Sequence, residues 1–174
     1  MRDLKRTAIW LAALMAIVFA GDRLLSALLE QVLTRSRFRF SRIYAGGSDA
    51  KIVIVGDSRG VHSFYAPAIE RETGQSVLNL SFNSLSPVIA EALLADYLDR
   101  NPAPRVVVVE VTSSVVGMDL ASQLLPYAGL SPRLEAIYRQ AHPVSARAAA
   151  VFHLLRFDSD FFLRALAYLR HDDQ

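Results

Sequence analysis

The chain has 174 residues, which suits one domain with a modest hydrophobic core. Its formal net charge is only +2, so the overall charge does not indicate nucleic acid as a partner. It contains no cysteine, which excludes disulfides, a thiolate nucleophile and zinc sites built on cysteine, and leaves the redox compartment open.

The N-terminal segment is strongly apolar and follows a basic start. Arg2, Lys5 and Arg6 precede residues 7–21, which carry no charged side chain. As a helix, residues 7–21 span about 22 Å, which is shorter than a hydrocarbon core of about 30 Å. Residues 7–29 span about 34 Å, so we expect this longer stretch to lie in a lipid bilayer.

This segment divides the chain into an anchor and a domain. We expect residues 1–33 to be a cytoplasmic start and a single-pass anchor helix in the cell membrane. The basic start favours a cytoplasmic N-terminus, which places the domain outside the cytoplasm. Two alternatives stay open, namely a signal peptide cleaved before Gly21 and a helix buried in the core.

A basic segment, residues 34–50, lies between the anchor and the domain. Its arginines are Arg35, Arg37, Arg39 and Arg42. It ends in a glycine-containing stretch, residues 45–50, that is typical of a flexible hinge. We interpret residues 34–50 as a basic linker that is solvated. The alternative is an arginine stripe that contacts anionic lipid headgroups.

The remainder, residues 51–174, has the alternating pattern of an α/β domain. The predicted elements are strands at 51–55, 76–80 and 105–111, and helices at 67–73, 87–100, 130–140, 144–155 and 158–170. Apolar strands joined by helical crossovers indicate a parallel sheet that is covered on both faces. Because no further strand is predicted, one apolar strand edge is expected to be unpaired.

The first predicted strand ends in a sharp turn, Gly56-Asp57-Ser58. A serine on a strand-to-helix turn is presented outward, where a nucleophile must lie, so the turn indicates ester hydrolysis or acyl transfer. The alternative is that Asp57 or Ser58 caps the helix that follows. No His, Asp or Glu cluster has metal-ligand spacing, and we expect neither a metal nor a cofactor.

A glycine-aspartate-serine turn on the first strand, followed by Asn-Leu-Ser-Phe-Asn-Ser at residues 79–84, resembles the SGNH (GDSL-type) hydrolase superfamily. The N-terminal apolar segment is similar to the membrane-anchored branch of that superfamily. The resemblance implies a partial flavodoxin-like α/β fold of three layers, with strand order 2-1-3-4-5. It also implies a serine esterase or O-acyltransferase that acts on envelope-associated esters or glycans.

The resemblance assigns roles to individual residues. Ser58 is the catalytic nucleophile, and its own backbone N–H is one oxyanion donor. Ser84 replaces the glycine whose N–H is the second donor, and Ser114 replaces the asparagine of the third donor. Side chains that would support the site belong to Asp57, Arg59, Asn79 and Asn83.

One motif of the superfamily is missing from the sequence. The superfamily takes its catalytic base from an Asp-x-x-His motif, but none of the four histidines has an acidic residue three positions before it. His62, one helical turn beyond Ser58, is the nearest replacement by position. Glu110 lies near the end of the third predicted strand, and we expect it to face solvent. The missing motif favours an alternative function, a truncated, non-catalytic relative that serves as an envelope interaction module.

Overall fold

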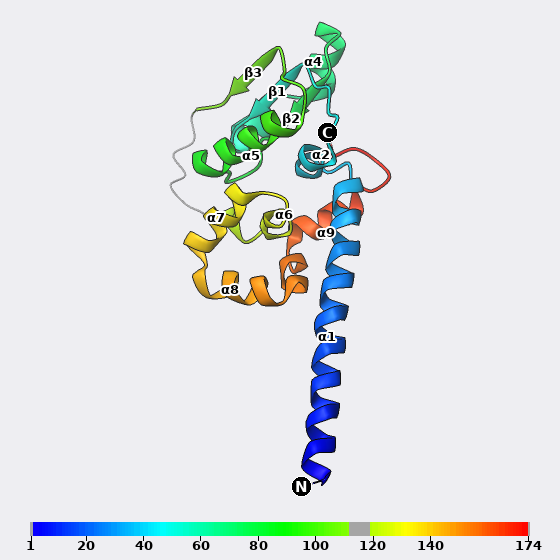
Figure 1. Ribbon diagram of the computed structural model, residues 1–174. Helices are drawn as coiled ribbons and strands as arrows, with labels where there is room; N and C mark the ends of the chain where they lie inside the picture. The colour runs from blue at the N-terminus through cyan, green and yellow to red at the C-terminus, as the bar shows by residue number, and fades with distance from the viewer. Residues whose placement is uncertain (1, 112–118, 174) are drawn as a thin grey trace.

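The computed structural model describes residues 2–111 and 119–173 (Figure 1). A long N-terminal helix projects from a body that holds a small sheet at one end and a group of short helices nearer the projecting helix. The elements are α1 (Arg2–Arg35), α2 (Arg39–Ala45), β1 (Ile52–Val55), α3 (Ser58–Ser63), α4 (Ala66–Thr73), β2 (Val77–Asn79), α5 (Pro87–Arg100), β3 (Val106–Val109), η1 (Asp119–Ala121), α6 (Leu125–Ala128), α7 (Pro132–Ala141), α8 (Pro143–Val151), η2 (His153–Phe157) and α9 (Asp160–Ala167).

Within the described residues, the sheet has three parallel strands in the order β2-β1-β3. Val53 of β1 pairs with Leu78 of β2 on one side and with Val107 of β3 on the other. Each connection returns through helices, which is what parallel pairing requires. The predicted α/β class and the three strands are confirmed. A flavodoxin-like sheet of the SGNH type remains a proposal, because only three strands are described.

Alternate residues of β1 enter two different cores, one on each face of the sheet. Val53 and Val55 belong to the larger core, which also includes residues of α1, α2, α5 and α9. Ile54 packs in a smaller cluster with Ala66 of α4. The period of two along the strand therefore places helices on both faces of β1, in three layers.

The edge strand β3 is less covered than the sequence indicates. Val106, Val107 and Val109 are 49%, 38% and 55% exposed. Among the described residues β3 pairs with β1 alone, so its other edge is open, as predicted from the small number of strands. The expectation of cover on both faces is wrong for β3, because the helices that flank β1 do not extend over it.

The segment expected to be a solvated linker contains α2, and that expectation is wrong for α2. Phe38, Phe40 and Ile43 are at most 2% exposed, because aromatic and aliphatic residues between the arginines point into the core. The Tyr44 hydroxyl donates a hydrogen bond to the Asp96 carboxylate at 2.7 Å. Burial and this carboxylate raise the pKa of Tyr44 well above its usual range, so the hydroxyl keeps its proton.

Two arginines of this segment, Arg37 and Arg39, form ion pairs with aspartates at the C-terminal end of the chain. The Arg39 side chain, 13% exposed, forms an ion pair with Asp173 at 2.9 Å and donates to the Ser81 carbonyl at 2.6 Å. Arg35 lies about 20 Å further along α1 than Asp22, where the helix enters the body. Arg39 is therefore held by the domain, while contact of the other arginines with lipid headgroups remains a prediction.

Helix α1 is long and apolar enough to span a membrane. The predicted anchor is supported to this extent, by length and composition only. Residues 4–20 are exposed on all sides, so a helix buried in the core is wrong for this stretch. From Asp22 onward, one side of the helix packs on the body, with Ser26 and Leu33 buried. The stretch free on all sides is thus 4–20, while the last part of the expected span, residues 22–29, is covered by the body on one side.

Candidate functional site

The loops after all three strands meet at the carboxyl edge of the sheet. The Glu110 N–H donates to the Val55 carbonyl at 2.9 Å, and the Phe82 N–H donates to the Gly56 carbonyl at 3.1 Å. The chain leaves β1 toward β2 on one side, while β3 lies on the other side. In parallel α/β sheets, ligands bind beyond the carboxyl ends of the strands at such a point of divergence.

The turn after β1 is held by close packing and a helix cap. A Cβ on Gly56 would lie 2.5 Å from the Cβ of Glu110, so only glycine lets the ends of β1 and β3 approach so closely. The buried Asp57 carboxylate accepts a hydrogen bond from the Arg59 N–H at 2.9 Å. Asp57 is therefore the N-cap of α3, as one reading of the sequence predicts.

Ser58 is the first residue of α3 and is half-buried. Across residues 2–111 and 119–173, no side chain is hydrogen-bonded to its hydroxyl, and His62 forms no such bond. The side chains of Arg59 and His62, further along the same helix, are exposed. Among the described residues, the turn therefore presents the serine with no base hydrogen-bonded to it.

Asn79, at the end of β2, connects three segments around the Ser58 turn. Its Nδ2 donates to the carbonyls of Gly60 and Phe64, each at 3.0 Å, and its Oδ1 accepts from the Ser81 N–H at 2.9 Å. The side chain is only 4% exposed. Asn79 thus affects the site through its bonds to backbone groups, because these bonds fix α3 and the loop after β2 relative to each other.

Ser84 has a left-handed backbone conformation, with φ at 61°. No other non-glycine residue in the described ranges has a positive φ. The Leu85 N–H donates to the Phe82 carbonyl at 3.0 Å, which closes a β-turn with Asn83 and Ser84 at its centre. Glycine is the usual residue at a turn position with positive φ, and glycine is also what the resemblance expects here.

The backbone N–H groups assigned to the oxyanion are not used by secondary structure. Neither the Ser58 nor the Ser84 N–H donates to a backbone carbonyl within the described part of the chain. An oxyanion donor must be available in this way when the substrate binds. Ser114, which was expected to stand at the third donor position, lies outside the described residues.

We expect Ser84→Gly to raise the free energy of unfolding by up to about 1 kcal/mol, because glycine adopts a positive φ without steric cost. Asn83→Gly is the matched control, since Asn83 is the exposed neighbour in the same turn and has no positive φ. That control should lower stability by about 0.5 kcal/mol through backbone entropy. Urea unfolding followed by circular dichroism measures both. Equal effects of the two glycines would contradict the left-handed assignment.

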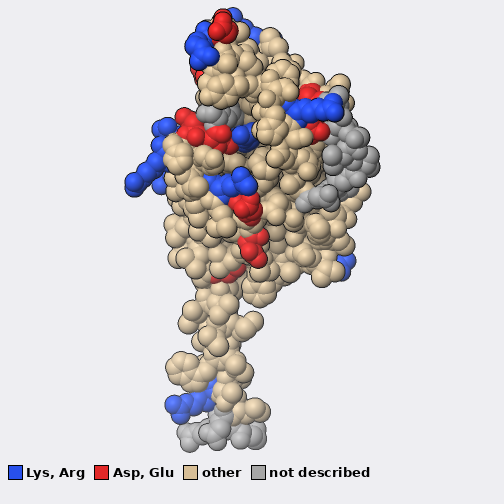
Figure 2. Space-filling view, turned by 180° about the vertical axis from the view of Figure 1, so that it is seen from behind, with Lys and Arg blue, Asp and Glu red and all other residues tan. Residues whose placement is uncertain are grey.

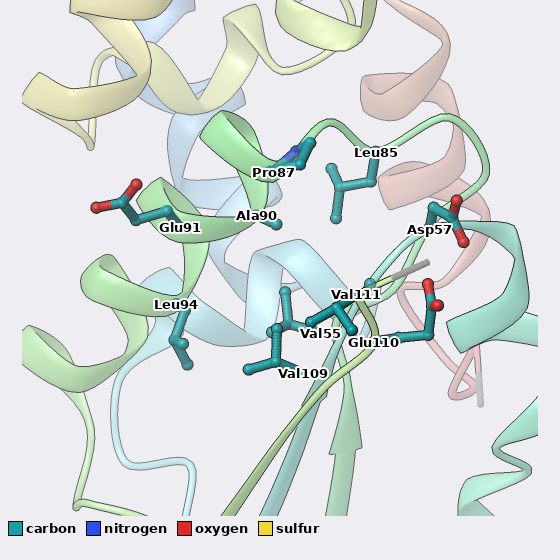
Figure 3. A pocket seen from close by; sticks show the side chains of 11 residues that line it. Val55, Asp57, Leu85, Pro87, Ala90, Glu91, Leu94, Val109, Glu110 and Val111 are labelled. Atoms are coloured by element: carbon teal, nitrogen blue, oxygen red, sulfur yellow. The ribbon is translucent and has the colours of Figure 1, made fainter. Parts of the chain in front are cut away.

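An apolar cavity of about 420 Å³ opens beside the turn (Figure 3). It lies between the carboxyl ends of β1 and β3 and the first half of α5. Its lining residues are Val55, Gly56, Asp57, Leu85, Pro87, Ala90, Glu91, Leu94, Val109, Glu110 and Val111. The walls are mostly aliphatic, so the cavity suits a hydrocarbon chain better than a sugar.

The acidic side chains of the cavity lie at its two ends. Figure 3 shows the Asp57 and Glu110 carboxylates close to each other at one end, with Glu91 on α5 at the opposite end. The expectation that Glu110 faces solvent is wrong: it is half-buried, because the ends of β1 and β3 pack tightly at Gly56. No sequence pattern indicates the cavity, because its walls come from β1, β3 and α5, which are separate in the chain.

Within the ranges described, no group of three or more His, Asp or Glu side chains could hold a metal ion. Comparisons with protein-family models, with curated proteins and with solved structures gave no match. The SGNH resemblance therefore remains an interpretation of residues 56–58 and 79–84 and of the turns that they form.

Proposed function

We propose that this chain is a membrane-anchored, SGNH-like serine esterase or O-acyltransferase domain that acts on envelope-associated esters or glycans. The observation that carries the proposal is the position of Ser58, on the turn after β1 and next to an apolar cavity at the carboxyl edge of the sheet. Helix α1 holds the domain at the cell membrane, on the extracytoplasmic side that the basic start favours.

In the proposed reaction, the Ser58 hydroxyl attacks the ester carbonyl and gives up its proton to a base. The N–H groups of Ser58 and Ser84 stabilise the oxyanion, and the acyl chain lies in the apolar cavity. The alcohol leaves with a proton, and an acyl-enzyme remains. Water or a glycan hydroxyl then takes the acyl group. The residues described contribute the nucleophile, the donors and the cavity, but not the base.

A second candidate is a non-catalytic envelope module that binds an acyl-bearing ligand in the same cavity. The specific observation in its favour is that, throughout the described ranges, no histidine or carboxylate is hydrogen-bonded to the Ser58 hydroxyl. A serine without a base is a weak nucleophile at neutral pH. In this case Ser58 serves only as the first residue of α3.

A fluorophosphonate probe separates the two candidates. The full chain in detergent is incubated with the probe, and the labelled residue is identified by mass spectrometry. We expect labelling at Ser58 that falls at least tenfold in Ser58→Ala and is unchanged in Ser63→Ala, an exposed serine on the same helix. A folded wild-type chain that takes no label, but binds a fluorescent fatty acid as well as Ser58→Ala does, would exclude the esterase and support the binding module.

A further inference from the structure

The exposed part of α1 is too short to cross a bilayer by itself. Residues 4–20 are exposed on all sides, and as a helix they extend about 26 Å. The hydrocarbon core is about 30 Å thick. If α1 spans it, as the proposed anchoring requires, the apolar region must reach the level of Asp22 and Arg23, where the helix meets the body.

At that level, α1 is fastened to the C-terminal helices. The buried Asp22 carboxylate accepts hydrogen bonds from the N–H groups of His153 and Leu154, at 2.9 Å and 3.0 Å. The Arg23 guanidinium donates to the Val151 carbonyl at 3.0 Å. These bonds cap the start of η2 and the end of α8, and Asp22 and Arg23 also form an ion pair at 4.0 Å. They also fix α8 and η2 beside the point where α1 leaves the body.

The orientation of α8 suits a membrane surface. Figure 1 shows α8 crossing the direction of α1 at the end of the body that lies nearest the N-terminus. In Figure 2, the coloured part of the projecting helix carries no acidic side chain, and its basic side chains lie near the tip. A plane perpendicular to α1 at Asp22 would therefore run along α8 and meet the start of η2 at His153.

Much of the surface that α8 and η2 turn outward is apolar, with Arg147 as the exposed charged side chain of α8. Val144, Val151, Phe152 and Leu155 are 77%, 52%, 43% and 47% exposed. We call these four residues the α8–η2 face. Ala149, on the opposite side of α8, is buried against the body. An exposed apolar stripe with an aromatic residue, on a helix parallel to the membrane plane, is typical of elements that lie in the bilayer interface.

We propose that the α8–η2 face rests in the interface of the bilayer that α1 enters, so that the domain has two membrane contacts and a fixed orientation. The proposal rests on the anchoring role of α1 and is independent of the chemistry at Ser58. The occupant of the face is lipid, because the length of the exposed helix brings the hydrocarbon boundary to this level. The apolar cavity beside Ser58 is then held at a set height above the membrane.

The absence of cysteine allows the proposal to be tested with single labels. Leu155→Cys, Leu14→Cys and Leu98→Cys are labelled with an environment-sensitive fluorophore. Leu155 lies in the α8–η2 face, Leu14 lies in the exposed part of α1, and Leu98 is a 45% exposed position on α5. The full chain is placed in vesicles of phosphatidylcholine and phosphatidylglycerol that contain a brominated lipid, which quenches only fluorophores in contact with acyl chains.

We expect strong quenching at Leu14→Cys, clear quenching with a blue-shifted emission at Leu155→Cys, and none at Leu98→Cys. Quenching at Leu14→Cys without quenching at Leu155→Cys would overturn the second contact and leave the anchor intact. No quenching at Leu14→Cys would overturn both. A blue shift at Leu155→Cys that persists in detergent and is not quenched by lipid would assign the face to a second copy of the chain instead.

Discussion

Replacing Gly60 by alanine is expected to lower the free energy of unfolding by about 2 kcal/mol, because the new methyl group has no room. A Cβ at this position would overlap the Ser81 Oγ and lie 2.7 Å from the Ser81 Cβ. Ser81 is fully buried, and Asn79 accepts a hydrogen bond from its backbone N–H, so it cannot move aside at low cost. Urea unfolding of the full chain in detergent measures the change.

Two further variants make this result specific. In Gly60→Ala with Ser81→Gly, the overlapping atoms are removed, and we expect at least half of the lost stability to return. Gly21→Ala is the matched control, since a Cβ there meets nothing within 4 Å and alanine favours the helix. A Gly60→Ala chain that unfolds at the wild-type urea concentration would show that α3 and the loop after β2 do not pack as described.

The start of α5 at Pro87 follows from the sequence, whereas the helices expected at 130–140 and 144–155 begin at Pro132 and Pro143. Pro87, Pro132 and Pro143 each begin a helix in the structure. The first helical position does not use its N–H as a donor, and the φ that it requires is the one that the proline ring already sets. The strands at β1 and β2 follow from β-branched and apolar runs. These signals are local, so a single sequence is enough to read them.

The misread segments depend on partners far away in the chain. The four arginines around α2 indicate a linker, but Phe40 packs against Phe161 and Tyr44 stacks on Tyr127, each with ring centroids within 5.4 Å. In the same way, a run of four valines does not reveal whether helices will cover it, so the exposure of β3 was missed. The burial of these residues depends on tertiary contacts, which a local sequence pattern does not predict.

The sequence predicts the serine turn of the candidate site, but it does not predict the cavity beside the turn. The serine turn follows from a strand, a glycine and a capping residue in succession. The cavity arises only when β1, β3 and α5 are brought together, and the left-handed backbone of Ser84 was indicated only by the resemblance.

Removing the side chain of Asn79 is expected to lower the free energy of unfolding by about 3 kcal/mol, which is more than we expect for Gly60→Ala. Asn79→Ala leaves the Gly60 and Phe64 carbonyls and the Ser81 N–H without their side-chain partner in a buried place, and each such loss costs about 1 kcal/mol or more. The same change frees α3, so probe labelling at Ser58 should fall in parallel. Both are measured on one preparation, by urea unfolding and by fluorophosphonate labelling.

Asn83→Ala is the control for this loss, because Asn83 is an exposed asparagine four residues further along the same loop. We expect it to change stability by less than about 0.5 kcal/mol, as surface substitutions usually do. Asn79→Asp keeps the acceptor oxygen and loses both amide donors, so it should be at least as destabilising at neutral pH as the loss of two hydrogen bonds. If Asn79→Ala were as stable as Asn83→Ala, the position of α3 would not depend on Asn79, and the packing of Gly60 on Ser81 alone would fix the Ser58 turn.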